Sequence, residues 1–338
     1  MGIGEITPSM YRVGIIGAGL IGAKRAKALR PCDKLIAVAD LSHERAVTLA
    51  TTYGAQVESS WETLIQRKEI DIVVIATSNN AIPICATEAL KKGKHILIEK
   101  PGGRNPSELK PLLELSKKTQ KTARVGFNHR FHPAMLKAKS MLEEGAIGEL
   151  MYIRARYGHG GRIGYNQEWR ANPEISGGGE LLDQGVHLID LCRWMGGEFS
   201  LDVGRVHTFY WNMPVEDNGF LILKSPDQKR FAHLHASCTE WKNLFDFEIF
   251  GKKGKLQIWG LGRSYGTEEL RYYKVKPEMG VPELTSFSFP EEDQSWNLEW
   301  SALIDSIEGK QAPISTLEDA FKALEIVYSA YEQSGLKF

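Results

Sequence analysis

The sequence lacks an excess of charge of either sign, a long hydrophobic run and an N-terminal targeting pattern. Lysine and arginine total 42, as do aspartate and glutamate, so the formal net charge is zero. This balance argues against a general electrostatic attraction to nucleic acid or to an acidic membrane surface. The longest apolar stretch falls far short of a membrane span, and residues 1–10 contain neither the basic nor the apolar part of a signal peptide. We therefore expect a soluble cytoplasmic protein without nucleic-acid or membrane partners.

Cysteines are few and widely separated. The four are Cys32, Cys85, Cys192 and Cys238, and no two of them have the C-x-x-C spacing of a metal or redox site. They are typical of small apolar residues in a reducing compartment, and we expect no metal site. The remaining composition is that of an ordinary globular protein, and 338 residues are enough for two domains.

Strands and helices alternate in the first third of the chain. Short apolar runs predict strands at 12–16, 34–39, 71–77, 95–98 and 122–127, with helices at 43–53, 81–92 and 106–119 and another after residue 19. Parallel strands need crossovers of this length, so the alternation indicates βαβ units. We predict an α/β Rossmann domain, a doubly wound dinucleotide-binding fold, over residues 1–126.

A glycine-rich loop follows the first predicted strand and opens a helix. Its residues are Gly17, Ala18, Gly19, Leu20, Ile21 and Gly22, which fit the pattern G-x-G-x-x-G. In this context the first glycine permits a tight turn, the second leaves room for a pyrophosphate and the third lets the helix pack closely. Gly17, Gly19, Leu20, Ile21 and Gly22 are thus expected to contact a dinucleotide, the alternative being a structural turn without a ligand.

The identity of the dinucleotide depends on Asp40. This residue ends the second predicted strand, 18 positions after Gly22. A carboxylate here accepts hydrogen bonds from the adenosine ribose and repels a 2′-phosphate, which favours NAD over NADP. Arg45 lies five residues later and could soften that preference, so NADP is also possible.

Three further motifs carry a resemblance to a known family. They are Thr77-Ser78-Asn79-Asn80, Glu99-Lys100-Pro101 and the stretch GGGELLDQGVHLID over residues 177–190. Together with the glycine loop and Asp40, they make the chain resemble the glucose–fructose oxidoreductase and inositol dehydrogenase family, Gfo/Idh/MocA. The resemblance implies that Thr77, Asn79, Glu99 and Lys100 contact the cofactor, and that Lys100, Asp183 and His187 are the catalytic residues.

The second part of the chain reads as a sheet-rich domain. Strands are predicted at 151–157, 203–211, 219–224, 230–237, 245–250, 255–259 and 270–275, followed by a last helix at 317–331. The family resemblance implies a large open, mainly antiparallel sheet that often serves oligomerisation. We expect an α+β substrate-binding domain over residues 127–338 and a homodimer or homotetramer formed through its sheet, while the last helix could pack on the first domain.

The motif residues supply what alcohol oxidation requires. Asp183 and His187 are four residues apart on a predicted helix and so share one face. His187 suits a general base, Lys100 a proton-relay partner that binds the reacting oxygen, and Asp183 an orienting group, although Asp183 and His187 could exchange roles. The alternatives are an exposed intrahelical pair and a solvated lysine at a strand end.

The sequence predicts the substrate less directly than it predicts the cofactor. Asn128 and Arg130 follow the last strand of the first domain, and Arg156, Trp169 and Arg170 lie before the GGG segment. Guanidinium groups suit phosphate or carboxylate and aromatic rings suit sugars, so these five are candidate substrate residues. The alternatives are a hinge turn at Asn128 and, for Arg156, an exposed strand position paired with an acid.

The sequence thus predicts an NAD-dependent oxidoreductase. It would move a hydride between nicotinamide and a secondary alcohol carbon of a sugar, cyclitol, sugar acid or nucleotide sugar. One alternative is an NADPH-dependent keto-sugar reductase. Another is a non-catalytic regulator of the same fold that senses NAD and a ligand.

Overall fold

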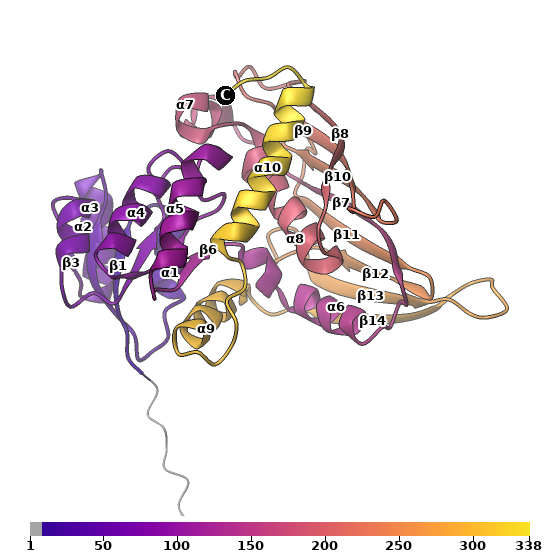
Figure 1. Cartoon of the computed structure of the whole chain (residues 1–338), viewed down its shortest axis with the longest axis horizontal. Helices are drawn as coiled ribbons and strands as arrows, with labels where there is room; N and C mark the ends of the chain where they lie inside the picture. Colours follow the sequence, from indigo (N-terminus) through magenta and orange to yellow (C-terminus); the bar gives the residue numbers. More distant parts are fainter. Residues whose placement is uncertain (1–8) are drawn as a thin grey trace, which may run out of the picture. The chain divides into compact units, whose positions relative to one another are not determined.

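The computed structural model of the chain describes residues 9–338, which form two compact units (Figure 1). The first unit comprises residues 9–102, 110–126 and 296–317, and the second comprises residues 103–109, 127–295 and 318–338. A single boundary at residue 126 is therefore too simple. The last helix belongs to the second unit, and it is the segment before it that returns to the first.

The first unit is built on a six-stranded parallel sheet. Its strands are β1 (Arg12–Ile16), β2 (Lys34–Ala39), β3 (Gln56–Val57), β4 (Ile72–Ile75), β5 (His95–Ile98) and β6 (Ala123–Val125). Their order is β3-β2-β1-β4-β5-β6, and every neighbouring pair is parallel. The chain reverses its direction of winding between β1 and β4, where doubly wound sheets bind their ligands. The predicted Rossmann fold is confirmed.

Helices cover this sheet. They are α1 (Leu20–Lys27), α2 (His43–Tyr53), α3 (Trp61–Gln66), α4 (Ile82–Lys91), α5 (Pro106–Lys118) and the returning α9 (Ser295–Ile307). The α2 helix begins where predicted because the Ser42 hydroxyl accepts the Arg45 N–H, and it ends at Gly54 in the left-handed conformation. Trp300, Leu303 and Ile304 of α9 join the buried cluster around Val13 and Ile15, so a distant segment completes this core.

The second unit contains an eight-stranded sheet. Its strands are β7 (Leu150–Gly158), β8 (Ser200–His207), β9 (Asn218–Lys224), β10 (Phe231–Ser237), β11 (Leu244–Gly251), β12 (Gly254–Trp259), β13 (Glu268–Lys274) and β14 (Glu283–Phe289). The order is β14-β13-β12-β11-β7-β10-β9-β8, and β7 with β10 is the one parallel pair within the described sheet. The predicted open, mainly antiparallel sheet is thus confirmed, with β14 in addition.

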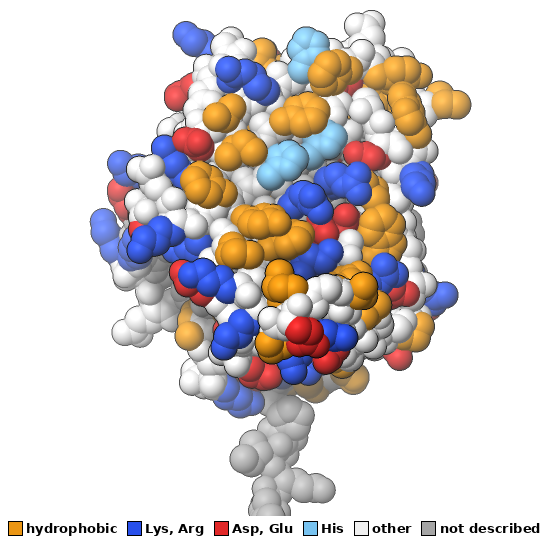
Figure 2. Space-filling view, turned by 90° about the vertical axis from the view of Figure 1, so that its right-hand side faces the viewer, with side chains coloured by type: hydrophobic (Ala, Val, Ile, Leu, Met, Phe, Trp, Pro, Cys, Tyr) orange, Lys and Arg blue, Asp and Glu red, His pale blue; other side chains and the backbone are white. Residues whose placement is uncertain are grey.

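The two faces of this sheet differ. The helices α6 (Pro133–Glu143), α8 (Val186–Gly196) and α10 (Leu317–Gln333) pack on one face. The other face exposes Tyr152, Val203, Phe220, Phe231 and Trp259. Figure 2 shows apolar, basic and histidine side chains intermingled on this side of the molecule. No helix within residues 9–338 has both the length and the hydropathy needed to cross a membrane.

One strand was misplaced in the sequence analysis. β8 ends at His207, whereas the pattern of alternating residues predicted a strand to residue 211. The reason is Asp217, whose carboxylate accepts the N–H groups of Phe209, Tyr210 and Trp211 at 2.8–3.0 Å. These donors are satisfied by a side chain at the end of the same connection, just before β9, so they do not need partners in the sheet.

Candidate active site

The glycine loop has the geometry that a dinucleotide requires. Gly17 has a φ of +97°, and a Cβ atom there would lie 2.4 Å from the Ala76 carbonyl oxygen. A Cβ on Gly22 would lie 1.9 Å from the Gly17 carbonyl oxygen, so only glycine allows α1 to start this close to the loop. A Cβ on Gly19 would meet nothing within 4 Å, and open space at this position is what an approaching diphosphate needs.

The first turn of α1 is arranged for an anion. Gly19 precedes the helix without a side-chain cap, and no acidic residue lies in the first turn. The backbone N–H groups at such a helix start carry partial positive charge and lack intrahelical partners. Leu20 is 75% exposed and Ile21 is partly exposed at the same place. These residues fit the diphosphate of NAD.

Asp40 holds the loop and its surroundings together. Its Oδ2 accepts the Ala18 N–H at 2.6 Å, and its Oδ1 accepts the Ser42 N–H at 2.7 Å. Arg45 donates from Nη2 to Oδ1 at 2.9 Å, while more than half of the Arg45 side chain stays exposed. The carboxylate that would select a ribose diol thus has a cation directly beside it.

The remaining predicted cofactor residues lie beyond β4 and β5. Thr77 follows β4 and is partly buried, its hydroxyl donating to the Ser78 carbonyl oxygen at 3.3 Å, and Asn79 is buried. Lys100 is partly exposed after β5, before the cis peptide bond to Pro101.

Glu99 has a structural partner. Its Oε1 accepts from Nε of the buried Arg25 at 2.6 Å, and Arg25 also bonds Glu299 of α9. A Cβ on Gly126 would lie 2.3 Å from Arg25 Nη2. Glu99 therefore forms a buried ion pair, and its contact with the cofactor stays a prediction.

In the second unit, Asp183 and His187 lie on a helix that begins irregularly. Residues Leu181–Gly185 form a π-helical turn that runs directly into α8, where the sequence predicted one regular helix. Asp183 belongs to the π turn and His187 to the first turn of α8. Single π turns are frequent at functional sites because they alter the direction in which side chains project.

The GGG segment before this turn is packed against buried groups. A Cβ on Gly178 would lie 2.1 Å from the Tyr331 hydroxyl, and one on Gly179 would lie 2.0 Å from the Glu216 carbonyl oxygen. Glu216 is buried and accepts the N–H groups of Gly179 and Leu181 and the Tyr331 hydroxyl, at 2.8–3.0 Å. Sequence reasoning missed Glu216, since no local motif marks a carboxylate that satisfies the start of a distant helix.

Asp183 has an arginine partner. Arg170 donates from Nε to Asp183 Oδ2 at 3.1 Å, and its guanidinium lies 4.6 Å from the centre of the Trp169 ring. The sequence grouped Trp169 and Arg170 as substrate residues. The structure gives Arg170 an orienting contact with the predicted catalytic carboxylate.

A second carboxylate precedes this turn. Glu180 is buried and accepts from the Tyr165 hydroxyl at 3.2 Å, with His159 Nε2 at 3.5 Å. Burial raises the pKa of Glu180 from its ordinary value. A polar cluster around Glu180 thus lies next in sequence to the predicted acid–base pair.

His187 is buried in an aromatic setting. Its ring stacks on His129 with centroids 3.8 Å apart and planes at 17°, and Phe127 and Tyr157 present edges to it. The orientation of the imidazole is therefore fixed by packing on both a ring face and ring edges.

Asn128 supports this stack. Its Oδ1 lies 3.2 Å from His129 Nδ1, and its Nδ2 donates to the Ser295 hydroxyl at 2.9 Å. Asn128 is buried, so it contacts His129, which in turn contacts His187.

Two of the predicted substrate arginines have other partners. Arg130 is buried and forms two hydrogen bonds with Asp190, at 2.8 and 2.5 Å, and lies 3.3 Å from Asp319. Arg156 projects from the outer face of the sheet and lies 3.4 Å from Asp246. Both contacts agree with the structural alternatives, and we leave both residues out of the proposed substrate site.

Comparisons with known proteins identify the family of this chain. Residues 11–127 match the oxidoreductase family with an NAD-binding Rossmann fold, and residues 135–257 match the GFO/IDH/MocA C-terminal domain. Levoglucosan dehydrogenase of Pseudarthrobacter phenanthrenivorans is 33% identical over 61% of this chain and 56% of its own length. The uncharacterized oxidoreductase YrbE of Bacillus subtilis is 30% identical over 71% of each chain, and inositol 2-dehydrogenase of Rhizobium meliloti is 29% identical over 72% and 74%.

Solved structures show the same fold. Levoglucosan dehydrogenase in complex with NADH superposes with a TM-score of 0.86 at 23% identity, covering 96% of this chain and 98% of that one. GenD2 from gentamicin A biosynthesis in complex with NAD superposes with a TM-score of 0.83 at 20% identity, over 99% and 97%. The family matches together cover most of both units. The chain belongs to the GFO/IDH/MocA family of oxidoreductases, and its first unit is an NAD-binding Rossmann domain.

Proposed function

We propose that the protein is an NAD-dependent dehydrogenase that oxidises a secondary alcohol carbon of a neutral sugar or cyclitol. The observation that carries this proposal is the acid–base helix of the second unit, where Asp183 is held by Arg170 and His187 by the His129 stack. The same chain has the glycine loop and Asp40 described above, which suit a dinucleotide. Relatives named levoglucosan dehydrogenase, D-glucoside 3-dehydrogenase and inositol 2-dehydrogenase act on such polyols.

The arginines favour an uncharged substrate. The three candidate substrate arginines, and two that lie near them in sequence, are each paired with a carboxylate of the second unit: Arg130 with Asp190, Arg154 with Glu248, Arg156 with Asp246, Arg162 with Glu168 and Arg170 with Asp183. A guanidinium whose charge is already matched gains less from a phosphate or carboxylate ligand. We therefore rank a free sugar, glycoside or cyclitol above a nucleotide sugar or a sugar acid.

The reaction follows from the residues. Bound NAD⁺ would supply the acceptor for the hydride of the carbinol carbon. His187 accepts the hydroxyl proton as general base, and the product is a ketone. Asp183 orients the reacting hydroxyl, and its contact with Arg170 limits its freedom to turn. Lys100 polarises the reacting oxygen with its ammonium group. Asp183 and His187 could exchange roles.

The test is turnover with a panel of substrates. The absorbance of reduced nicotinamide would be followed with NAD⁺ and with NADP⁺, against free sugars, glycosides, cyclitols, sugar acids and nucleotide sugars. We expect turnover with a neutral polyol, and a loss of about a hundredfold or more in Lys100→Met with NADH binding retained. Near-normal turnover in Lys100→Met would remove Lys100 from the mechanism.

The proposal would be contradicted if no substrate of the panel were turned over in either direction of reaction, although NADH binds. That result would favour a ligand-sensing regulator instead. We also propose that the enzyme works in the cytoplasm and as a homodimer or homotetramer, formed through the outer face of the eight-stranded sheet.

A further inference from the structure

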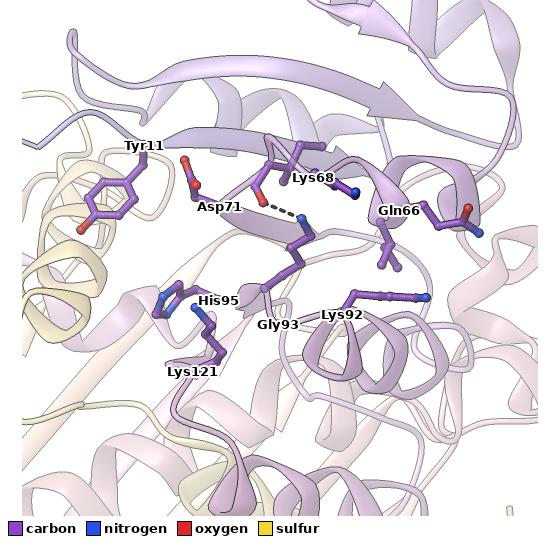
Figure 3. Close-up of a pocket in the computed structure, with 11 residues that line it drawn as sticks. Tyr11, Gln66, Lys68, Asp71, Lys92, Gly93, His95 and Lys121 are labelled. Carbon is purple, nitrogen blue, oxygen red and sulfur yellow. Dashed lines mark hydrogen bonds between the residues drawn. The ribbon is translucent and has the colours of Figure 1, made fainter.

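A hollow of about 570 Å³ opens at the edge of the parallel sheet opposite to the cofactor loop (Figure 3). Tyr11 precedes β1, and the other lining residues lie at the end of α3, in the connections that lead into β4, β5 and β6, or at the start of β5: Ile65, Gln66, Lys68, Ile70, Asp71, Lys92, Gly93, Lys94, His95 and Lys121. These are the amino ends of the strands, whereas the glycine loop follows a carboxyl end. The volume is within the range of about 300–1,000 Å³ that small-molecule sites occupy.

Positive charge dominates the lining. It contains four lysines but one acid, Asp71, and that carboxylate is already bound by Arg12 at 2.9–3.1 Å. Lys68, Lys92 and Lys121 form no hydrogen bond or ion pair with any residue in the range 9–338 that the structure describes. Three ammonium groups around one concave surface, without protein carboxylates to match them, attract an anion.

The fourth lysine is fixed in place. Lys94 is 6% exposed and donates from Nζ to the carbonyl oxygens of Arg67 and Ile70, at 2.6 and 2.7 Å. Burial lowers its pKa from the ordinary value of lysine. A buried ammonium that is bound by carbonyl oxygens is further stabilised by a nearby anion.

The neutral residues of the hollow add donors. Burial, and then the charge of Lys121, lower the pKa of His95 to about 4. The ring is neutral at physiological pH, and since Nδ1 accepts the Thr122 N–H at 3.0 Å, its proton is on Nε2. Burial raises the pKa of Tyr11, so its phenol also keeps its proton. Figure 3 shows Tyr11, His95 and Lys121 toward one end of the hollow, and Gln66 and Lys92 toward the other.

We propose that this hollow is a second anion site, which binds a small phosphate-bearing molecule and is distinct from the cofactor site. Flexible ammonium groups surround the opening, while Lys94 and His95 supply more rigid donors. This matches the several acceptor oxygens of a phosphomonoester or a diphosphate. The hollow is concave and bounded, and the chain has no net positive charge, so a small anion fits better than nucleic acid.

Inorganic diphosphate and glucose 6-phosphate would be titrated into the full-length protein by calorimetry. Saturating NADH would be present, so that the diphosphate region of the cofactor site is filled. We expect one site per chain, with an affinity that falls as salt is raised. The better of the two probes identifies the phosphate class. No binding of either probe would overturn the proposal.

Variants locate the site. Lys92→Gln/Lys121→Gln should weaken binding of the better probe by about tenfold or more, because two of the unmatched charges are removed. Lys27→Gln/Lys118→Gln removes the same charge from exposed positions outside the lining and should leave the affinity unchanged. Equal affinity in the two double variants would overturn the assignment.

Folding and ligand class are controlled separately. NADH affinity and melting temperature should match the wild type in both double variants, and Lys68→Gln/Lys92→Gln, at two exposed positions, replaces the first variant if Lys121 proves structural. The proposal of a small-molecule site would be contradicted if an oligonucleotide displaced diphosphate and bound more tightly than diphosphate does. The test does not depend on dehydrogenase activity, so its outcome is separate from that of the proposed function.

Discussion

At the residue scale, the proposed catalytic carboxylate, Asp183, is oriented by a neighbouring arginine. Asp183 could be picked out from the GGG motif, but the 3.1 Å contact with Arg170 could not, since the two are 13 residues apart with the short helix α7 (Pro173–Ser176) and a glycine-rich segment between them. A cation beside a carboxylate favours its ionised form and fixes its direction. Arg170 is therefore a positioning residue for the proposed reaction.

Arg170→Met tests that role. We expect kcat to fall about tenfold or more with a smaller change in KM, a range typical of groups that orient a reacting residue. The acidic limb of the pH–rate profile should also move to higher pH, because the ionised carboxylate loses its nearby cation. Arg162→Met, which breaks an exposed pair with Glu168, is the matched control and should retain both kcat and the profile. An equal loss of kcat in both variants would show that the role of Arg170 is merely structural.

We propose that two side chains, Asp40 and Arg45, also set the choice between NAD and NADP. Arg45 is held against Asp40 at 2.9 Å, and removal of the carboxylate would release its guanidinium for a 2′-phosphate. In Asp40→Ser, the ratio of kcat/KM for NADP to that for NAD should rise about a hundredfold. Asp40→Ser/Arg45→Gln should lose most of that gain. If the double variant keeps it, repulsion by Asp40 alone sets the preference, and Arg45 has no part in binding the phosphate.

At the element scale, regular local patterns were predictable and long-range packing was not. β1, α2 and β5 occupy the predicted residues because apolar runs, a serine cap and terminal glycines mark them locally. The elements that were missed include β3, α3, α6, α9 and β14. The α9 helix is placed by Trp300, which is buried in the first unit and donates to Asp33 Oδ2 at 2.8 Å across 267 residues. No local pattern encodes that contact.

The π turn also depends on a long-range contact rather than on a local pattern. Its sequence, LLDQG, has nothing that distinguishes it from an ordinary helical start. Its entry is fixed by Glu216, which takes the N–H groups of Gly179 and Leu181 from 30 or more residues away. The candidate site could therefore be named residue by residue from motifs, while the backbone shape that presents Asp183 depends on a tertiary contact.

Glu216 gives this element a pH dependence. Burial raises its pKa to about 7 from 4.5, although three hydrogen bonds favour the carboxylate. Between pH 4.5 and about 7, the folded protein therefore keeps the proton of Glu216, whereas the unfolded chain has lost it. The stabilising contribution is full below pH 4.5 and is lost as the pH rises toward 7, by about 3 kcal/mol in all.

Glu216→Gln removes this titration. We expect the unfolding free energy of the wild type, relative to that of the variant, to fall as the pH rises from about 4.5 to 7, as measured by denaturant titration at several pH values. Glu332→Gln, on the exposed side of α10, should run parallel to the wild type at every pH. A constant difference between wild type and Glu216→Gln would mean that Glu216 ionises normally in the folded protein.

At the scale of the whole molecule, the exposed face of the eight-stranded sheet needs an explanation. Tyr152 of β7 lies opposite Phe231 of β10 and stacks on Phe250 of β11 with centroids 4.3 Å apart, and Phe220 stacks on His235 at 4.2 Å. Arg154 and Arg156 run between them and are matched by Glu248 and Asp246 of the same sheet. Apolar rings among internally paired charges suit a self-complementary contact with a second copy, because neither copy presents uncompensated charge.

This face should therefore control the oligomeric state. The wild type should sediment as a dimer or tetramer at micromolar concentration, and Tyr152→Lys/Phe231→Lys should sediment as a monomer with unchanged NADH affinity, because four lysines would meet across each pair of chains. Ile84→Lys/Leu136→Lys adds the same charge at exposed apolar positions on α4 and α6 and should leave the oligomer intact. If both double variants remain oligomeric, the contact lies elsewhere on the chain. If the wild type is itself monomeric, the apolar rings on this face must serve a different partner, since a polyol substrate cannot cover a sheet surface of this extent.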